Sequence, residues 1–173
     1  MPYDSSPLAQ EQDLSAIAKE RGVRYFMISY TDLFGYQRAK LVPAIAIADM
    51  QKDGAGFAGF ATWLDLTPAH PDLFAIPDPS TFIQLPWNRE IGWVAADLVM
   101  EDKPVAQAPR VVLKRVMKDA ADKGLYIKTG VECEFFLTKP CGTLISDDAD
   151  RAAKSCDDQP ALMPRHDVIS ALC

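Results

Sequence analysis

Two glutamates separated by a single residue stand in an otherwise apolar stretch, KTGVECEFFL, at residues 128–137. On a β-strand, side chains at positions i and i+2 project from the same face, roughly 6–7 Å apart. A strand here would therefore place the carboxylates of Glu132 and Glu134 side by side. Carboxylate oxygens are the preferred ligands of hard divalent cations such as Mg²⁺ and Mn²⁺. The pair is a candidate metal site for phosphoryl chemistry, with one ligand for each of two metals.

The same pair is also compatible with an ordinary strand that has one solvated face, because exposed glutamate is common in proteins. The uncharged neighbours Thr129 and Gly130 on one side, and the run Phe135-Phe136-Leu137 on the other, favour a covered sheet instead. Two buried carboxylates this close would need a cation between them. The residues by themselves leave both interpretations open.

The preceding sequence predicts a small α+β domain. A helix is expected over residues 8–21, strands over 23–32 and 37–42 that can pair antiparallel, a short helix over 44–53, and strands over 81–87 and 91–100. Between these elements, residues 54–82 are rich in glycine, proline and aromatic residues. We expect a long loop with little regular structure there, and such loops in compact domains are usually functional.

Residues 101–109, EDKPVAQAP, are the expected boundary between two domains, and a helix is expected from Pro109 with Gly124 after its end. Its apolar face comprises Val112, Leu113, Val116, Met117, Ala120 and Ala121. Beyond residues 128–137 the sequence predicts a turn over 139–142, an acidic loop, and a helix that begins near Pro164 and is still continuing at Cys173. We therefore expect the chain to be a fragment of a longer protein.

Composition excludes several classes of partner. The chain has 173 residues, a formal net charge of -6 and no run rich in Lys or Arg, so neither nucleic acid nor a membrane is expected as a partner. The N-terminal residues lack the basic and apolar regions of a secretory signal, which favours a cytoplasmic protein with reduced thiols. His70 and His166 each stand apart from other potential ligands and are expected to be surface or turn residues.

Several blocks together resemble the glutamine synthetase family. Residues 129–137 resemble the Gly-x-Glu-x-Glu-Phe-Phe strand that opens its catalytic domain, and residues 25–43 resemble its first hairpin. Residues 59–87 resemble its loop ending in Asp-x-x-x-x-Pro-Asp-x-x-Thr, and residues 108–115 resemble its Pro-Arg helix start. The blocks follow the family order over residues 15–173. The sequence of the loop is most similar to that of the type III-like branch, which includes γ-glutamylmethylamide synthetases.

The resemblance implies an α+β fold, with a β-grasp domain over residues 1–105 and an incomplete segment of an α/β barrel-like catalytic domain over residues 106–173. It also implies an ATP-dependent glutamate–ammonia or glutamate–amine ligase that acts through a γ-glutamyl phosphate. The implied cofactors are ATP with Mg²⁺ or Mn²⁺. Glu132 would help to hold the metal on the ATP phosphates, and Glu134 the metal near the substrate glutamate.

The family also implies self-association into rings, with a dodecamer as the expected assembly. In that family, loop aspartates of one subunit reach into the neighbouring site, where they bind and deprotonate ammonium. Asp72 matches one of these aspartates and would act as the catalytic base. The other aspartate belongs to a Phe-Asp-Gly-Ser-Ser stretch, and Ala58 occupies its position here. Asp65 is an alternative carboxylate, although turn capping is the more common role for Asp65 and Asp78.

The absence of a carboxylate at Ala58, together with the neighbouring Phe57, Phe60 and Trp63, predicts a small alkylamine substrate in preference to ammonium. The nucleotide-binding and glutamate-binding residues of the family lie outside this chain, so the fragment by itself is expected to be inactive. A different class of function stays open at this point: a truncated, non-catalytic homologue that acts as an interaction or assembly module.

Overall fold

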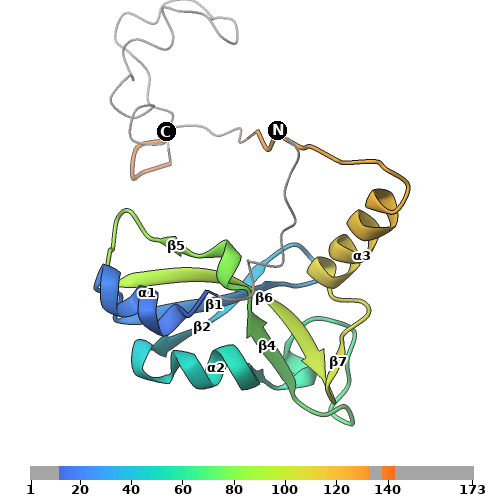
Figure 1. Cartoon of the computed structure of the whole chain (residues 1–173), viewed down its shortest axis with the longest axis horizontal. Coiled ribbons are helices and arrows are strands. Elements are labelled where there is room, and N and C mark those ends of the chain that lie inside the picture. Colours follow the sequence, from blue (N-terminus) through green and yellow to red (C-terminus); the bar gives the residue numbers. More distant parts are fainter. Residues whose placement is uncertain (1–11, 133–137, 143–173) are drawn as a thin grey trace, which may run out of the picture. The chain divides into compact units, whose positions relative to one another are not determined.

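The computed structural model describes residues 12–132 and 138–142, and the chain divides into two compact units, Met1–Ile127 and Lys128–Cys173. The sheet and helices described below belong to the first unit (Figure 1). In the second unit, the predicted turn over residues 139–142 is confirmed, because the N–H of Gly142 donates to the carbonyl of Lys139 (2.8 Å). The domain boundary expected between residues 105 and 106 stays a prediction.

A mixed sheet forms the centre of the first unit. In the described residues its strands are β1 (Tyr25–Thr31), β2 (Gln37–Pro43), β3 (Ala55–Phe57), β4 (Leu73–Pro77), β5 (Ile83–Gln84), β6 (Ile91–Met100) and β7 (Lys103–Pro104). The order across the sheet is β2-β1-β6-β4-β3, and β5 and β7 also pair with β6. The β1–β6 pair is parallel and the other pairs are antiparallel. A mixed sheet with a few helices confirms the expected α+β class.

The helices of the described region are α1 (Leu14–Arg21), α2 (Ile47–Asp53) and α3 (Pro109–Ala121), with short 3₁₀ turns at Ala44–Ala46, Gly59–Ala61 and Pro79–Thr81. Helix α1 begins at Leu14 because the Asp13 carboxylate accepts from the N–H of Ser15 (2.8 Å), which caps the first turn. The predicted start at residue 8 is therefore wrong for residues 12 and 13, and residues 8–11 lie outside the described region.

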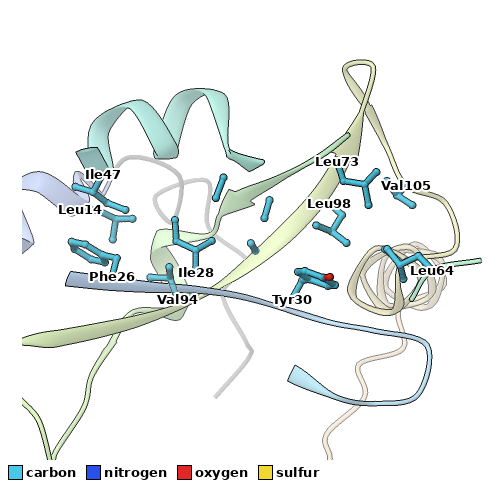
Figure 2. Packing of buried hydrophobic residues seen from close by; sticks show 14 of the residues in the cluster. Leu14, Phe26, Ile28, Tyr30, Ile47, Leu64, Leu73, Val94, Leu98 and Val105 are labelled. Atoms are coloured by element: carbon cyan, nitrogen blue, oxygen red, sulfur yellow. The ribbon is translucent and has the colours of Figure 1, made fainter. Parts of the chain in front are cut away.

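Part of the core lies between the sheet and the first two helices, and the rest lies further along the sheet, around Leu73, Leu98 and Val105 (Figure 2). Helices α1 and α2 contact each other, and Leu14 of α1 and Ile47 of α2 are fully buried with Phe26 and Ile28 of β1. Burial alternates along β6, where every second residue from Gly92 to Leu98 faces the core. This period of two is that of a strand packed on one face. Each fully buried Leu, Ile or Phe contributes about 1.5–3 kcal/mol.

The long loop predicted over residues 54–82 is partly wrong, because it contains β3 and β4. These strands form a hairpin with Ala55 opposite Ala75, and β4 pairs in turn with β6. Gly54 makes the close approach possible: a Cβ at this position would lie 2.9 Å from the Cβ of Phe74. The strand expected over residues 81–87 is also shorter than predicted, since the chain forms a 3₁₀ turn before β5.

A single side chain extends from the outer strand β2 to the outer strand β3. Lys40 of β2 donates its Nζ to the carbonyl of Gly56 in β3, and the same ammonium lies 4.9 Å from the ring centroid of Phe57. Tyr30 of β1 also meets Phe57 edge to face, with the ring centroids 5.0 Å apart. The sheet is thus curled, so that strands at opposite ends of its order approach each other.

Residues 101–109, where the domain boundary is expected, are mostly exposed but are anchored to the sheet at two buried positions. Strand β7 pairs with β6, the N–H of Val105 donates to the carbonyl of Leu98 (2.9 Å), and both Val105 and Ala108 are buried. Helix α3 begins at Pro109 as predicted. Much of its apolar face is exposed in the described structure, including Leu113, Val116 and Met117.

Candidate active-site loop

The loop between β3 and β4, residues 58–72, carries both positions that the family pattern associates with amine binding. The last pair of the β3–β4 hairpin is Phe57 opposite Leu73. Continuing this register by one residue places Ala58 opposite Asp72, and both residues are exposed. In this continued register, Ala58, which lacks a carboxylate, lies across from Asp72, which has one. The sequence by itself did not predict this relationship.

Gly59 keeps the two sides of the loop in contact beyond that point. A Cβ added to Gly59 would lie 2.5 Å from the carbonyl oxygen of Pro71, which is closer than real Cβ atoms approach. The obstacle is a backbone atom, so a rotamer change could not relieve it. The structure therefore requires glycine at position 59 to hold Ala58 beside Asp72.

Thr62 connects the first half of the 58–72 loop to the sheet through hydrogen bonds. Its hydroxyl donates to the carbonyl of Gly59 (2.6 Å), and its own carbonyl accepts from the hydroxyl of Tyr30 (3.4 Å). Both Thr62 and Tyr30 are buried, and burial raises the pKa of the Tyr30 phenol. The polar groups of this part of the loop are thus satisfied inside the protein rather than by water.

Two residues of the loop adopt the left-handed backbone region without being glycine. Trp63 has φ 57° and Asp65 has φ 59°. This conformation costs roughly 1–2 kcal/mol for an ordinary residue, so surrounding contacts must maintain it. Leu64, between the two, is fully buried, and its carbonyl accepts from the side-chain amide of Gln107 (3.1 Å).

A buried carboxylate organises the hairpin turn next to this loop. Asp32 accepts from the N–H groups of Phe34 (2.9 Å) and Tyr36 (3.0 Å) and from Nε of Arg38 (2.8 Å). Burial by itself would raise the pKa of Asp32. The hydrogen bonds from Arg38 and from the two backbone N–H groups, with the charge of Arg38, more than offset that effect and hold the pKa below its ordinary value.

The turn before Asp72 is held by His70. The ring Nδ1 of His70 accepts from the N–H of Thr67 (3.0 Å), and the N–H of His70 donates to the carbonyl of Thr67 (3.0 Å). The prediction that His70 is a turn residue is confirmed. The turn leads directly into Pro71 and Asp72, so it sets the direction in which the chain enters β4.

Asp78, at the opposite end of β4, has the capping role that was predicted for it. Its carboxylate accepts from the N–H of Ser80 (3.1 Å) and closes the 3₁₀ turn Pro79–Thr81. It also pairs with Arg110 and with Lys114 (3.3 Å), both on α3, and the same two cations pair with Asp97 of β6. Sequence reasoning missed this cluster, although the spacing of Arg110 and Lys114 by four residues places them on one helix face.

Comparison with known proteins supports the family resemblance over nearly the whole chain. No protein-family model matches it. A protein named glutamine synthetase from Rhizobium leguminosarum bv. phaseoli is 68% identical over 161 residues, which cover 93% of this chain and 37% of that protein. A solved structure of a GmaS–ADP complex has a TM-score of 0.85 at 60% identity, covering 93% of this chain and 37% of that one. The chain belongs to the glutamine synthetase family.

The proteins that match this chain do not all carry the same name. A glutamate–methylamine ligase from Methyloversatilis universalis is 36% identical over 148 residues, which cover 83% of this chain and 34% of that protein. The present chain therefore spans little more than a third of the length of these relatives. Across the described residues, no helix is long and apolar enough to cross a membrane.

The stretch that contains Glu132 and Glu134 lies partly outside the described residues. Glu132 is exposed and residues 128–132 form no regular secondary structure, so the expected strand is wrong for that part; Glu134 is not described. A strand needs a neighbouring strand to satisfy its backbone groups, and no described strand pairs with residues 128–132. Within the described residues, no group of three or more potential ligands could hold a metal. The metal-binding roles of Glu132 and Glu134 stay predictions.

Proposed function

We propose that this chain is part of an ATP-dependent glutamate–amine ligase that prefers a small alkylamine to ammonium. The observation that carries the proposal is the cross-strand placement of Ala58 and Asp72 in a chain of the glutamine synthetase family. The names of its relatives, glutamine synthetase and glutamate–methylamine ligase, support the reaction class.

In the proposed reaction, the γ-carboxylate of glutamate attacks the terminal phosphorus of ATP, and ADP leaves. The amine then attacks the carbonyl carbon of the γ-glutamyl phosphate, and phosphate leaves. Bound Mg²⁺ or Mn²⁺ would neutralise the charge on the transferred phosphoryl group. Glu132 and Glu134 are carboxylate donors suited to such metals.

Asp72 has two roles in this proposal. The amine arrives as a cation, so an exposed carboxylate at the loop attracts it. The cation must lose a proton before it can attack, and in this proposal Asp72 accepts that proton as a general base. Because the loop would serve the site of a neighbouring subunit, the activity belongs to a ring of complete subunits, and we propose that the 173-residue chain by itself is inactive.

The preference for an alkylamine follows from the balance of two effects at Ala58. Removing one buried partner of a charged group typically costs a few kcal/mol, which weakens the binding of ammonium. Covering a methylene group with apolar surface contributes about 0.8 kcal/mol, which favours an alkylated amine. Phe60 and Trp63, both exposed on the same loop, are available to supply that apolar surface.

The test is phosphate release that depends on ATP and glutamate, measured on the protein expressed from the complete reading frame that contains this sequence. Ammonium, methylamine and ethylamine are compared. Asp72→Asn should lower kcat/KM about 10²–10⁴-fold with every amine, as expected for loss of a general base. Asp65→Asn, on the same exposed loop, is the matched control and also tests the alternative carboxylate; it should change little.

Two results would contradict separate parts of the proposal. If the unmutated protein releases no phosphate with any amine, the ligase assignment is wrong, and the assembly module becomes the better explanation. If the unmutated protein prefers ammonium, the ligase assignment survives and the alkylamine preference is wrong. Binding of Mn²⁺ to the same protein and to its Glu132→Ala variant tests the metal role independently of turnover.

A further inference from the structure

Arg38 on β2 connects the buried carboxylate of one turn to the indole of the 58–72 loop. Its Nε donates to Oδ2 of Asp32 (2.8 Å), and its Cζ lies 5.5 Å from the ring centroid of Trp63. The guanidinium therefore contacts two groups from separate parts of the chain at the same time.

The anchor of this arrangement is rigid. The other oxygen of Asp32, Oδ1, accepts from the N–H groups of Phe34 and Tyr36, so the backbone of the turn fixes the carboxylate. The side chain of Asp32 is fully buried, whereas that of Arg38 is 37% exposed. Arg38 thus extends outward from a fixed internal point toward the surface where Trp63 lies.

The chemistry of arginine suits both contacts. A guanidinium is planar, donates hydrogen bonds from its edge to a carboxylate and stacks with its face on an aromatic ring. The ammonium of lysine is a compact point charge that can pair with Asp32 but offers no plane for the indole. A substitution by lysine should therefore keep the ion pair while weakening the contact with Trp63.

The residue that Arg38 contacts is one whose backbone needs support. Trp63 has φ 57°, its ring meets Phe34 edge to face with centroids 5.5 Å apart, and its carbonyl accepts from the N–H of Leu33 (3.3 Å). A strained conformation persists only where the surroundings impose it. Trp63 lies in the loop between Ala58 and Asp72, so its placement affects how the loop presents both positions.

We propose that Arg38 is a positioning residue for amine recognition: by holding Trp63 against the Asp32 turn, it keeps the 58–72 loop in the shape that presents Asp72 beside Ala58. The functional part of this inference rests on the proposed ligase activity. The structural part, that Arg38 maintains the loop conformation, does not depend on that activity.

The test compares Arg38→Met and Arg38→Lys in the protein expressed from the complete reading frame. Amide hydrogen exchange over residues 59–66 should become about tenfold faster in Arg38→Met, because the loop loses a contact that stabilises it. In the same variant, KM for methylamine should rise about tenfold, with a smaller change in kcat and none in KM for ATP. Arg38→Lys should recover part of both effects.

The matched control is Arg24→Met. Arg24 also pairs with a carboxylate, Glu90 (3.0 Å), and also lies over an aromatic ring, that of Tyr25 (5.9 Å), but both of these partners lie outside the 58–72 loop. It should leave both the exchange of residues 59–66 and KM for methylamine unchanged. If Arg38→Met unfolds the protein because Asp32 is left unpaired, the double variant Asp32→Asn with Arg38→Met removes that charge and repeats the measurement.

The outcomes separate the two proposals. Faster exchange of the loop together with a raised KM for methylamine supports the inference, and Trp63→Ala should then reproduce both effects without adding to those of Arg38→Met. Unchanged loop exchange in Arg38→Met overturns the inference, whatever the enzyme assay gives. Faster loop exchange in a protein whose unmutated form has no amine-dependent turnover supports the positioning role and overturns the proposed function.

Discussion

The register of the β3–β4 hairpin, continued by one residue past its last pair, places Ala58 opposite Asp72. A carboxylate introduced at position 58 would therefore stand next to an existing one, and the two together would favour a small cation with several N–H donors. We expect Ala58→Asp to shift the ratio of kcat/KM for ammonium to that for methylamine about tenfold or more toward ammonium. Steady-state phosphate release with each amine measures this ratio.

The control for that variant is Ala58→Ser, which adds a polar atom at the same position without a charge. It should leave the preference between the two amines nearly unchanged. An equal shift in both variants would mean that polarity or size at position 58, rather than a second carboxylate, determines the choice of amine.

Gly59→Ala should destabilise the first unit. The added Cβ would meet the carbonyl oxygen of Pro71 at 2.5 Å, and only a backbone movement could relieve the contact. Overpacking of this kind typically costs about 1–3 kcal/mol in the free energy of unfolding, measurable by chemical denaturation. Gly56→Ala is the matched control in the same hairpin. Its Cβ would find its nearest neighbour, Cε1 of Phe74, at an ordinary 3.7 Å.

The Asp78 cluster should make stability depend on pH in acid. Burial by itself would raise the pKa of Asp78, but the hydrogen bond from Ser80 and the charges of Lys114 and Arg110 hold it below its ordinary value. The folded-state pKa is thus lower than that of the unfolded chain, near 3.9. The resulting stabilisation is fully present above that value and is lost as the pH falls through the folded-state pKa.

Asp78→Asn should accordingly lower the free energy of unfolding by about 1–2 kcal/mol at neutral pH, allowing for the partial exposure of the two cations. The difference between the variant and the unmutated protein should shrink steadily below about pH 4. Asp122→Asn removes the exposed pair with Lys118 and should change stability little at any pH. A difference for Asp78→Asn that stays constant into acid would contradict the linkage.

Leu64→Ala should show that the candidate loop is part of the hydrophobic core. Leu64 is fully buried although it lies in the 58–72 loop, so its truncation should leave a cavity and cost about 2–5 kcal/mol in the free energy of unfolding. Leu113→Ala, on the exposed face of α3, should change stability by less than about 0.5 kcal/mol in the described chain. Comparable losses from the two substitutions would mean that this face of α3 is covered in solution.

The elements that could be predicted from the sequence are those with long, uninterrupted patterns. Strands β1, β2 and β6 and helix α3 lie close to their expected ranges, because hydrophobic alternation and the proline at the helix start are local signals. Strands β3 and β4 were missed for the opposite reason. Both strands are short, β3 directly follows Gly54, and β4 ends at Pro77. Strand β4 is also stabilised by pairing with β6, which is distant in the sequence.

The candidate site could also be predicted only in part. The residue types at Ala58 and Asp72 could be assigned by resemblance to a family pattern, whereas their placement opposite each other depends on the register of a hairpin that the sequence did not predict. The contact of Arg38 with Trp63 also had no local signal. It depends on a turn built around Asp32 and on a backbone conformation at Trp63 that is uncommon for tryptophan.

Lys40, which reaches from β2 to the carbonyl of Gly56, has a consequence for how copies of this chain meet. Strand β3 ends the strand order, and a strand in that position can act as a template on which a strand of another molecule adds by hydrogen bonding. Here one of its carbonyls already has a donor, and that donor brings a positive charge which an incoming strand would have to displace. A lysine placed in this way opposes edge-to-edge pairing of β3 with a strand of another chain.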